Sequence, residues 1–98
     1  MKDKVIKAVF DFTHRINGNG TYKVSFEFRA DTKDIDISIA TKQYRSVIDI
    51  LIENYKVSSY LHGQGIVDSK QRSNLIWLLN EVDLFVNKVN QMKKRKRK

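Results

Sequence analysis

Residues 22–30 alternate apolar and polar side chains without a break, and this pattern constrains the fold more than any other feature of the chain. The odd positions carry Lys, Ser, Glu and Arg. The even positions form the apolar face, which consists of Tyr22, Val24, Phe26, Phe28 and Ala30. A period of two, built from aromatic and β-branched residues, is typical of a strand with one buried face. The segment therefore requires a sheet.

Two neighbouring segments show the same period. In residues 5–12 the even positions are apolar, with Lys7 and Asp11 on the opposite side, and in residues 34–40 three isoleucines alternate with polar residues. The connections are rich in residues that favour turns: Asn17-Gly18-Asn19-Gly20 and Asp31-Thr32-Lys33-Asp34. We therefore expect a three-stranded antiparallel meander over residues 5–12, 22–30 and 34–40.

From Thr41 the apolar residues follow a helical spacing. Thr41 suits an N-cap, and a buried helix is predicted over residues 41–54 from the positions of Tyr44, Val47, Ile48, Leu51 and Tyr55. Residues 57–62 fit either a plain loop or a short helix ended by Gly63. A long helix is predicted to begin near Asp68, with Gln71 three residues later completing a capping box. Its main apolar stripe is Leu75, Leu78, Leu79, Val82, Val86 and Val89.

These segments predict one α+β domain over residues 1–92, with three strands followed by two or three helices. The net charge of +8 is concentrated behind this domain, because six of the 19 basic residues and none of the 11 acidic residues lie in 93–98. Residues 1–92 are therefore nearly balanced at +2. The basic tail has no apolar residue with which to pack, so we expect it to be disordered when free. Its residues are Lys93, Lys94, Arg95, Lys96, Arg97 and Lys98.

Several classes of protein are disfavoured. The absence of cysteine excludes disulfides and thiolate zinc sites, and no apolar run reaches the roughly 18 residues of a membrane span. His14 and His62 lack neighbouring ligands at metal-binding spacing, and His62-Gly63-Gln64-Gly65 lacks the remaining residues of a phosphate-binding loop. We therefore expect a cytoplasmic protein that is not an enzyme, with no metal, cofactor, small-molecule substrate or membrane partner.

The start of the last helix is wholly polar, whereas the segment after it is almost wholly apolar. Lys, Gln, Arg, Ser and Asn are side chains that bond base edges in the major groove, and a recognition helix reads bases with its N-terminal residues. The hypothesis is double-stranded DNA binding through Ser69, Lys70, Gln71, Arg72, Ser73 and Asn74. If residues 57–62 are helical, this segment completes a winged helix-turn-helix with residues 17–20 as the wing. Phosphate contacts are expected from Arg15, Lys23, Lys42 and Arg45, and the tail would add a log–log salt slope of about −5.

Three apolar residues of the last helix lie off its main stripe and predict a homodimer: Trp77, Leu84 and Phe85. The alternative is that the sheet covers both sides of this helix within a monomer.

A DNA-binding accessory or regulatory factor of a phage, plasmid or other mobile element suits the size of the chain. Two other functions stay open. The chain could be a module or inhibitor that docks on a host protein through Trp77 and Phe85, or it could bind RNA. RNA binding through the sheet is disfavoured, because its outer face lacks a row of aromatic residues.

Overall fold

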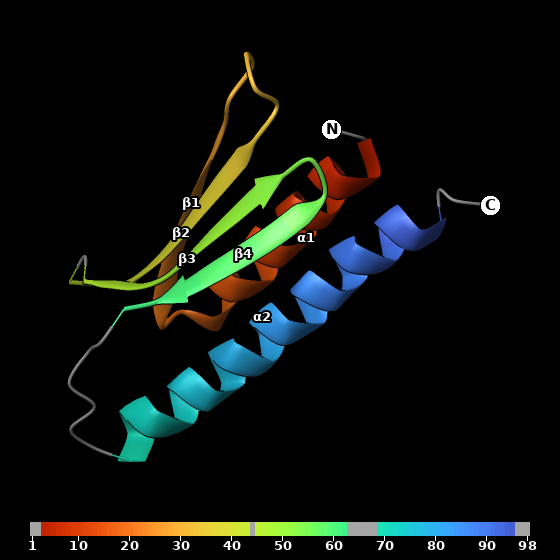
Figure 1. Ribbon diagram of the computed structural model, residues 1–98. Helices are drawn as coiled ribbons and strands as arrows, with labels where there is room; N and C mark the ends of the chain where they lie inside the picture. The colour runs from red at the N-terminus through yellow and green to blue at the C-terminus, as the bar shows by residue number, and fades with distance from the viewer. Residues whose placement is uncertain (1–2, 44, 63–68, 96–98) are drawn as a thin grey trace.

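The computed structural model describes residues 3–43, 45–62 and 69–95, with side chains described as far as Met92. Helix α1 (Asp3–Asn19) comes first and is followed by four strands, β1 (Tyr22–Phe28), β2 (Ile35–Thr41), β3 (Ser46–Glu53) and β4 (Lys56–Leu61). Helix α2 (Ser69–Arg95) completes the chain. Figure 1 shows both helices side by side on one face of the sheet, which gives a two-layer α+β architecture.

The sheet is an antiparallel meander in the order β1-β2-β3-β4. Its register places Phe26 opposite Ile37, and Ile37 opposite Ile50. The face toward the helices is the core, because Ile37 and Ile50 are each 1% exposed. The helices supply the other half of this core from their facing stripes: Val5, Val9, Phe12, Ile16, Leu78, Val82, Phe85 and Val89.

Part of the predicted fold is confirmed. The chain is α+β, strands occupy residues 22–28 and 35–41, and a long helix spans 69–95. Its predicted N-cap, Asp68, lies outside the described residues. The backbone of α2 continues to Arg95, and thus enters the range predicted as a disordered tail. Within the described part of the chain, neither helix has an apolar stretch long enough to cross a bilayer.

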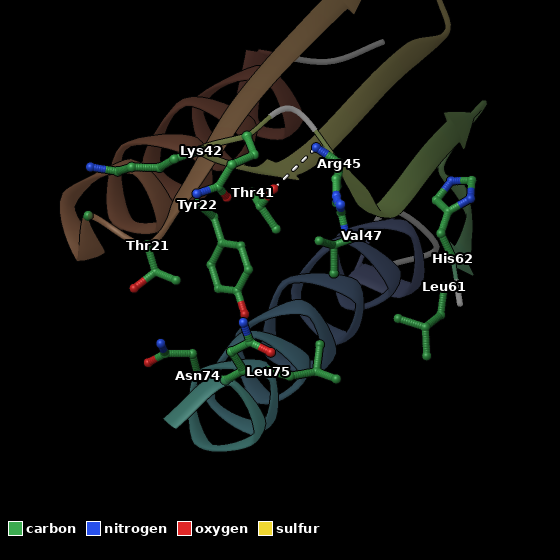
Figure 2. A pocket seen from close by; sticks show the side chains of 13 residues that line it. Thr21, Tyr22, Thr41, Lys42, Arg45, Val47, Leu61, His62, Asn74 and Leu75 are labelled. Atoms are coloured by element: carbon green, nitrogen blue, oxygen red, sulfur yellow. Dashed lines mark hydrogen bonds between the residues drawn. The ribbon is translucent and has the colours of Figure 1, made fainter. Parts of the chain in front are cut away.

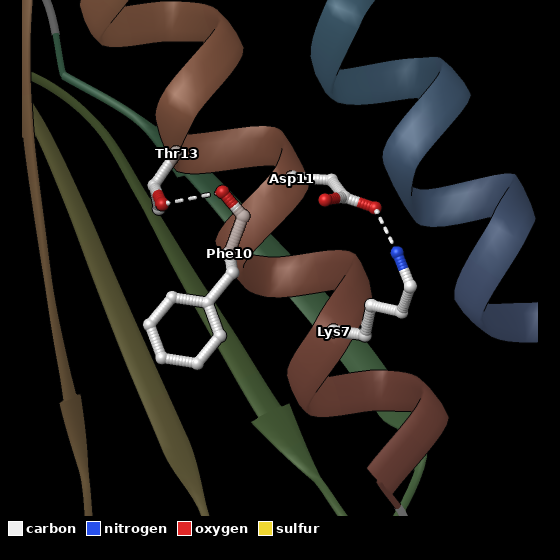
Figure 3. A network of polar contacts seen from close by, with 4 residues as sticks. All are labelled: Lys7, Phe10, Asp11 and Thr13. Atoms are coloured by element: carbon white, nitrogen blue, oxygen red, sulfur yellow. Dashed lines mark hydrogen bonds and ion pairs between the residues drawn. The ribbon is translucent and has the colours of Figure 1, made fainter.

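The prediction of a strand at residues 5–12 is wrong, because this segment lies in α1. Its apolar residues satisfy both periods over a short span, and the helical set extends further, to Ile16. The helix buries Val5, Val9 and Phe12, whereas Phe10, part of the predicted strand face, is 54% exposed. On the solvent side Lys7 and Asp11 form an i,i+4 ion pair of 3.4 Å (Figure 3).

The predicted helix over residues 41–54 and the short helix over 57–62 are also wrong. Thr41 ends β2, residues 46–61 form the β3–β4 hairpin, and Ile48, Ile50 and Ile52 alternate toward the helices. A two-residue turn joins Glu53 to Lys56, with φ of 51° at Asn54 and 70° at Tyr55. Positive φ at both positions defines a type I′ turn, whose twist matches that of the flanking strands.

The helix-turn-helix arrangement is therefore wrong, since its first two helices are strands. The proposed wing at residues 17–20 is instead the junction of α1 and β1. Asn17 belongs to the last turn of α1, and its Oδ1 accepts a hydrogen bond of 2.9 Å from the Val24 backbone N–H. Gly20 follows with a φ of 85°, a conformation that glycine adopts without strain.

Candidate nucleic-acid interface

Helix α2 is much longer than the sheet that it covers. Its 27 residues span about 40 Å, whereas the eight residues of β3 span about 27 Å. Figure 1 shows the start of α2 projecting beyond the ends of β2 and β4. Residues 69–73 are all exposed, and Leu78 is the first residue of this helix to be fully buried. The first turns of α2 therefore project from the core of the domain.

The loop between β2 and β3 lies at the same end of the sheet. The Arg45 backbone N–H donates to Thr41 Oγ1 at 3.1 Å, and the Thr41 N–H donates to the Arg45 carbonyl at 2.9 Å. These two bonds close a short loop that carries Lys42, with Arg45 at its end, and both side chains are exposed. The loop therefore holds two cations at fixed backbone positions beside the projecting part of α2.

A cavity of about 610 Å³ separates this loop from α2. Figure 2 shows the Tyr22 ring pointing from β1 toward the first turns of α2, between the loop and the helix. Only 6% of Tyr22 is exposed, and burial raises the pKa of its hydroxyl above the usual value for tyrosine. Val47, Leu61 and Leu75 form the apolar part of the wall. The polar lining is Thr21, Tyr22, Thr41, Lys42, Gln43, Arg45, His62, Gln71 and Asn74.

The described lining of this cavity includes Lys42 and Arg45 but no carboxylate. One lining residue has an acidic partner outside the lining, because Asp49 Oδ2 lies 2.7 Å from His62 Nε2. The Tyr60 ring packs edge-on against the His62 imidazole at a centroid distance of 5.2 Å. The cavity thus offers cations, hydroxyls and amides to a ligand, a set of groups that favours anions.

The face of the sheet that points away from the helices carries several carboxylates. Glu27, Asp36 and Asp49 line a shallow groove there, together with serines and Tyr60. Negative charge repels phosphate, and a base-stacking platform needs several exposed aromatic rings. Among the described residues that line this groove, Tyr60 is the only aromatic one. This surface is therefore a poor candidate for contact with a nucleic acid.

The structure brings together four of the residues predicted to contact DNA, because Lys42, Arg45, Gln71 and Asn74 all line the cavity. Ser69, Lys70, Arg72 and Ser73 lie on the exposed turns beside it. The sequence patterns did not point to Tyr22, Thr41 or His62 as part of this site. Each lies at or next to the end of a strand, and only the antiparallel register places these ends together.

Two other predicted phosphate contacts lie elsewhere. Arg15 Nε donates to Glu81 Oε1 at 2.7 Å, and this bond raises the pKa of the guanidinium above its usual value. The guanidinium thus joins α1 to α2. Lys23 lies on the outer face of β1, opposite Ala40. The side chains of the predicted tail, residues 93–98, lie outside the described part of the structure.

The three residues predicted to form a dimer interface have different environments. Phe85 is 4% exposed and stacks on Phe12 at a centroid distance of 4.4 Å, so it belongs to the core of its own chain. Trp77 is half-buried against the same core. Leu84 alone is freely accessible, at 65% exposed. The predicted interface is therefore corrected at Phe85, because burial in the monomer removes that ring from contact with a partner.

Among the described residues, no three His, Cys, Asp or Glu side chains converge in a way that could hold a metal ion. Comparison of the chain with protein-family models, curated proteins and solved structures gives no match.

Proposed function

We propose that this chain is a non-enzymatic protein that binds double-stranded DNA through the loop cations Lys42 and Arg45 and the exposed first turns of α2. The observation that carries the proposal is the meeting of these two segments at one end of the sheet, around a cavity whose described lining holds no carboxylate. Two cations on a closed loop are suited to phosphate, and polar side chains on a projecting helix are suited to base edges.

The length of the projecting segment favours a duplex over a single strand. The major groove is about 12 Å wide and admits an α-helix. Residues 69–73 are exposed ahead of the first fully buried residue of α2, so this end of the helix can enter a groove before the sheet meets the sugar–phosphate backbone. The acidic outer face of the sheet would then point away from the DNA.

The proposed test compares three variants in fluorescence anisotropy titrations with duplex DNA over a range of salt concentrations. Lys42→Ala/Arg45→Ala removes the loop cations and should reduce the magnitude of the log–log salt slope by about 2, since each lost phosphate contact contributes about 0.9. Lys70→Ala/Arg72→Ala should also reduce the preference for one sequence over random duplex.

The matched control is Lys4→Ala/Lys56→Ala. It removes the same charge from exposed positions at the start of α1 and at the start of β4, away from the proposed site. Its binding should stay within about twofold of the wild type. Equal weakening by all three double variants would reduce the proposal to general electrostatic attraction, and a wild type that binds no duplex at low salt would refute it.

A further inference from the structure

Among the strands that the structure describes, β1 is an edge of the sheet and pairs with β2 alone. The Arg29 N–H donates to the Asp34 carbonyl at 2.9 Å, so the backbone groups of Arg29 point toward β2. Because the direction alternates along a strand, those of Val24, Phe26 and Phe28 point away from β2. The bond from the Val24 N–H to Asn17 agrees with this direction. The backbone at Phe26 and Phe28 therefore faces the open edge.

Exposed aromatic rings lie along this edge. Phe26 is 37% exposed, Phe28 is 43% exposed and Phe10 of α1 is 54% exposed. The Phe10 ring lies edge-on to Phe26 at a centroid distance of 5.1 Å, and Figure 3 shows it directed from α1 toward the strands. We call Phe10, Phe26 and Phe28 the edge patch. Exposed apolar side chains beside unpaired strand backbone are typical of a surface that a further strand covers.

The outer face of β1 is complementary to itself in charge. It carries Lys23, Ser25 and Glu27, spaced two residues apart. If two copies of β1 pair antiparallel about a two-fold axis at Ser25, Lys23 of each copy lies opposite Glu27 of the other. The same register places Val24 opposite Phe26 of the second copy, and Tyr22 opposite Phe28.

Other registers lose this match. Because inner and outer faces must stay aligned, registers change in steps of two residues. A shift by one such step in one direction places Lys23 opposite Arg29 of the second copy. A shift by one step in the opposite direction places Lys23 opposite Ser25 of the second copy. A further step in either direction sets Lys23 against Lys23, or Glu27 against Glu27. An axis at Phe28 would pair Glu27 with Arg29 but leaves most of β1 unpaired. Among the registers that pair at least half of β1, opposite charges therefore meet twice only when the axis passes through Ser25.

The isolated chain also leaves Glu27 in an unfavourable position. Its cross-strand neighbour is Asp36, and like charges directly opposite each other destabilise a sheet. Arg29 already pairs with Asp36, at 3.0 Å. A lysine from a second strand would bring a cation to the free side of Glu27.

From these observations we propose that two copies of this chain form a homodimer through β1, which joins their sheets into one antiparallel sheet of eight strands. The edge patches of the two copies meet on the side of the helices, and Lys23 and Glu27 pair on the outer side. At Val24 the Phe26 carbonyl of the second copy takes the place of Asn17 Oδ1 as acceptor. This interface shares Tyr22 with the lining of the cavity at the proposed DNA site, and the dimer proposal does not depend on DNA binding.

The test is sedimentation velocity of the full chain over a range of concentrations, with circular dichroism to verify folding. Lys23→Glu and Glu27→Lys each set like charges opposite each other twice in the dimer, and each should raise the dissociation constant about fivefold or more. The double variant Lys23→Glu/Glu27→Lys restores opposite charges and should return the constant to within about twofold of the wild type. A monomer at every concentration, or a double variant no tighter than the single variants, would overturn the proposal.

A second pair of variants distinguishes a dimer that forms through β1 from a dimer that forms through α2. Phe26→Ser should weaken the dimer about tenfold, since it removes an edge-patch ring. Leu84→Ser removes an exposed apolar side chain of α2 and should leave the constant unchanged. The reverse result, with dissociation by Leu84→Ser and not by Phe26→Ser, would place the interface on α2 and refute pairing through β1.

Discussion

The side chain of Arg15 joins the two helices, because its Nε donates to Glu81 Oε1 at 2.7 Å across a sequence separation of 66 residues. The Glu81 side chain is only 10% exposed, whereas that of Arg15 is 64% exposed. A buried carboxylate needs a hydrogen-bonding cation, and this bond supplies it. The pair therefore fixes how α1 and α2 lie against each other beneath the sheet.

Arg15→Met should lower the free energy of unfolding, because it leaves the buried Glu81 carboxylate without this donor. The loss should be smaller than for a fully buried pair, since water reaches the guanidinium. Urea unfolding followed by Trp77 fluorescence measures the loss. Lys7→Met, which breaks the exposed pair with Asp11, is the matched control and should cost less than about 0.5 kcal/mol. Similar losses in both variants would contradict a special role for the bond between the helices.

Phe85→Ala should destabilise the fold by about 3–5 kcal/mol, because the ring is buried and stacked on Phe12. The neighbouring Leu84 is mostly exposed, so Leu84→Ala should change stability by less than about 0.5 kcal/mol. Thermal unfolding of both variants checks this contrast. A stable Phe85→Ala variant that dissociates a dimer would instead support the interface predicted from the sequence.

The stability of the protein should fall in alkali partly through Tyr22. Burial raises its pKa in the folded state above the unfolded value of about 10. Below pH 10 both states keep the proton and the contribution is fully present. Above it the unfolded state loses its proton first, so stability falls as the pH rises toward the folded pKa.

Urea unfolding at several pH values above 9 tests this expectation. Tyr22→Phe keeps the buried ring and should make the decline shallower. Tyr60→Phe removes a hydroxyl from a ring that is 67% exposed and serves as the matched control. An equal change of slope in both variants would argue against a contribution from the burial of Tyr22.

The β3–β4 turn should be sensitive to the side chain at Asn54, which has a φ of 51°. Asn54→Val should cost about 1–2 kcal/mol, since a β-branched residue fits this left-handed conformation poorly. Asn54→Gly should be nearly neutral, because glycine adopts the conformation freely but gains entropy in the unfolded state. Chemical unfolding of the two variants measures the difference, and a tolerated valine would show that the turn can rearrange.

The sequence predicted the structure correctly where apolar residues followed a single period, of a strand or of a helix, without interruption. Residues 22–30 and 34–40 alternate strictly, and most of β1 and β2 follow from that pattern alone. The projecting start of α2 was also predictable, since a polar segment precedes a continuous apolar stripe. Lys42, Arg45, Gln71 and Asn74 were each proposed from their charge or hydrogen-bonding groups, although nothing in the sequence showed that they share a cavity.

Two segments were misread because short apolar runs fit both periods. Residues 5–12 alternate as well as a strand, yet Val5, Val9, Phe12 and Ile16 form a longer helical stripe. Residues 44–55 have helical spacing, but the closely spaced isoleucines at 48, 50 and 52 fit a strand better. The turn at Asn54-Tyr55 lacks the glycine that usually marks a two-residue hairpin, so the break between β3 and β4 left no clear signal.

From the sequence alone it follows that this chain is α+β, that two segments are strands and that a long helix begins with a polar segment. These properties follow from local side-chain periodicity, which each segment carries on its own. Four other properties emerge only in the folded chain: the helical state of α1, the β3–β4 hairpin, the burial of Phe85 and the cavity beside Lys42 and Arg45. Each of these depends on which surfaces cover one another, and the packing of a shared core settles that choice where local patterns allow two solutions.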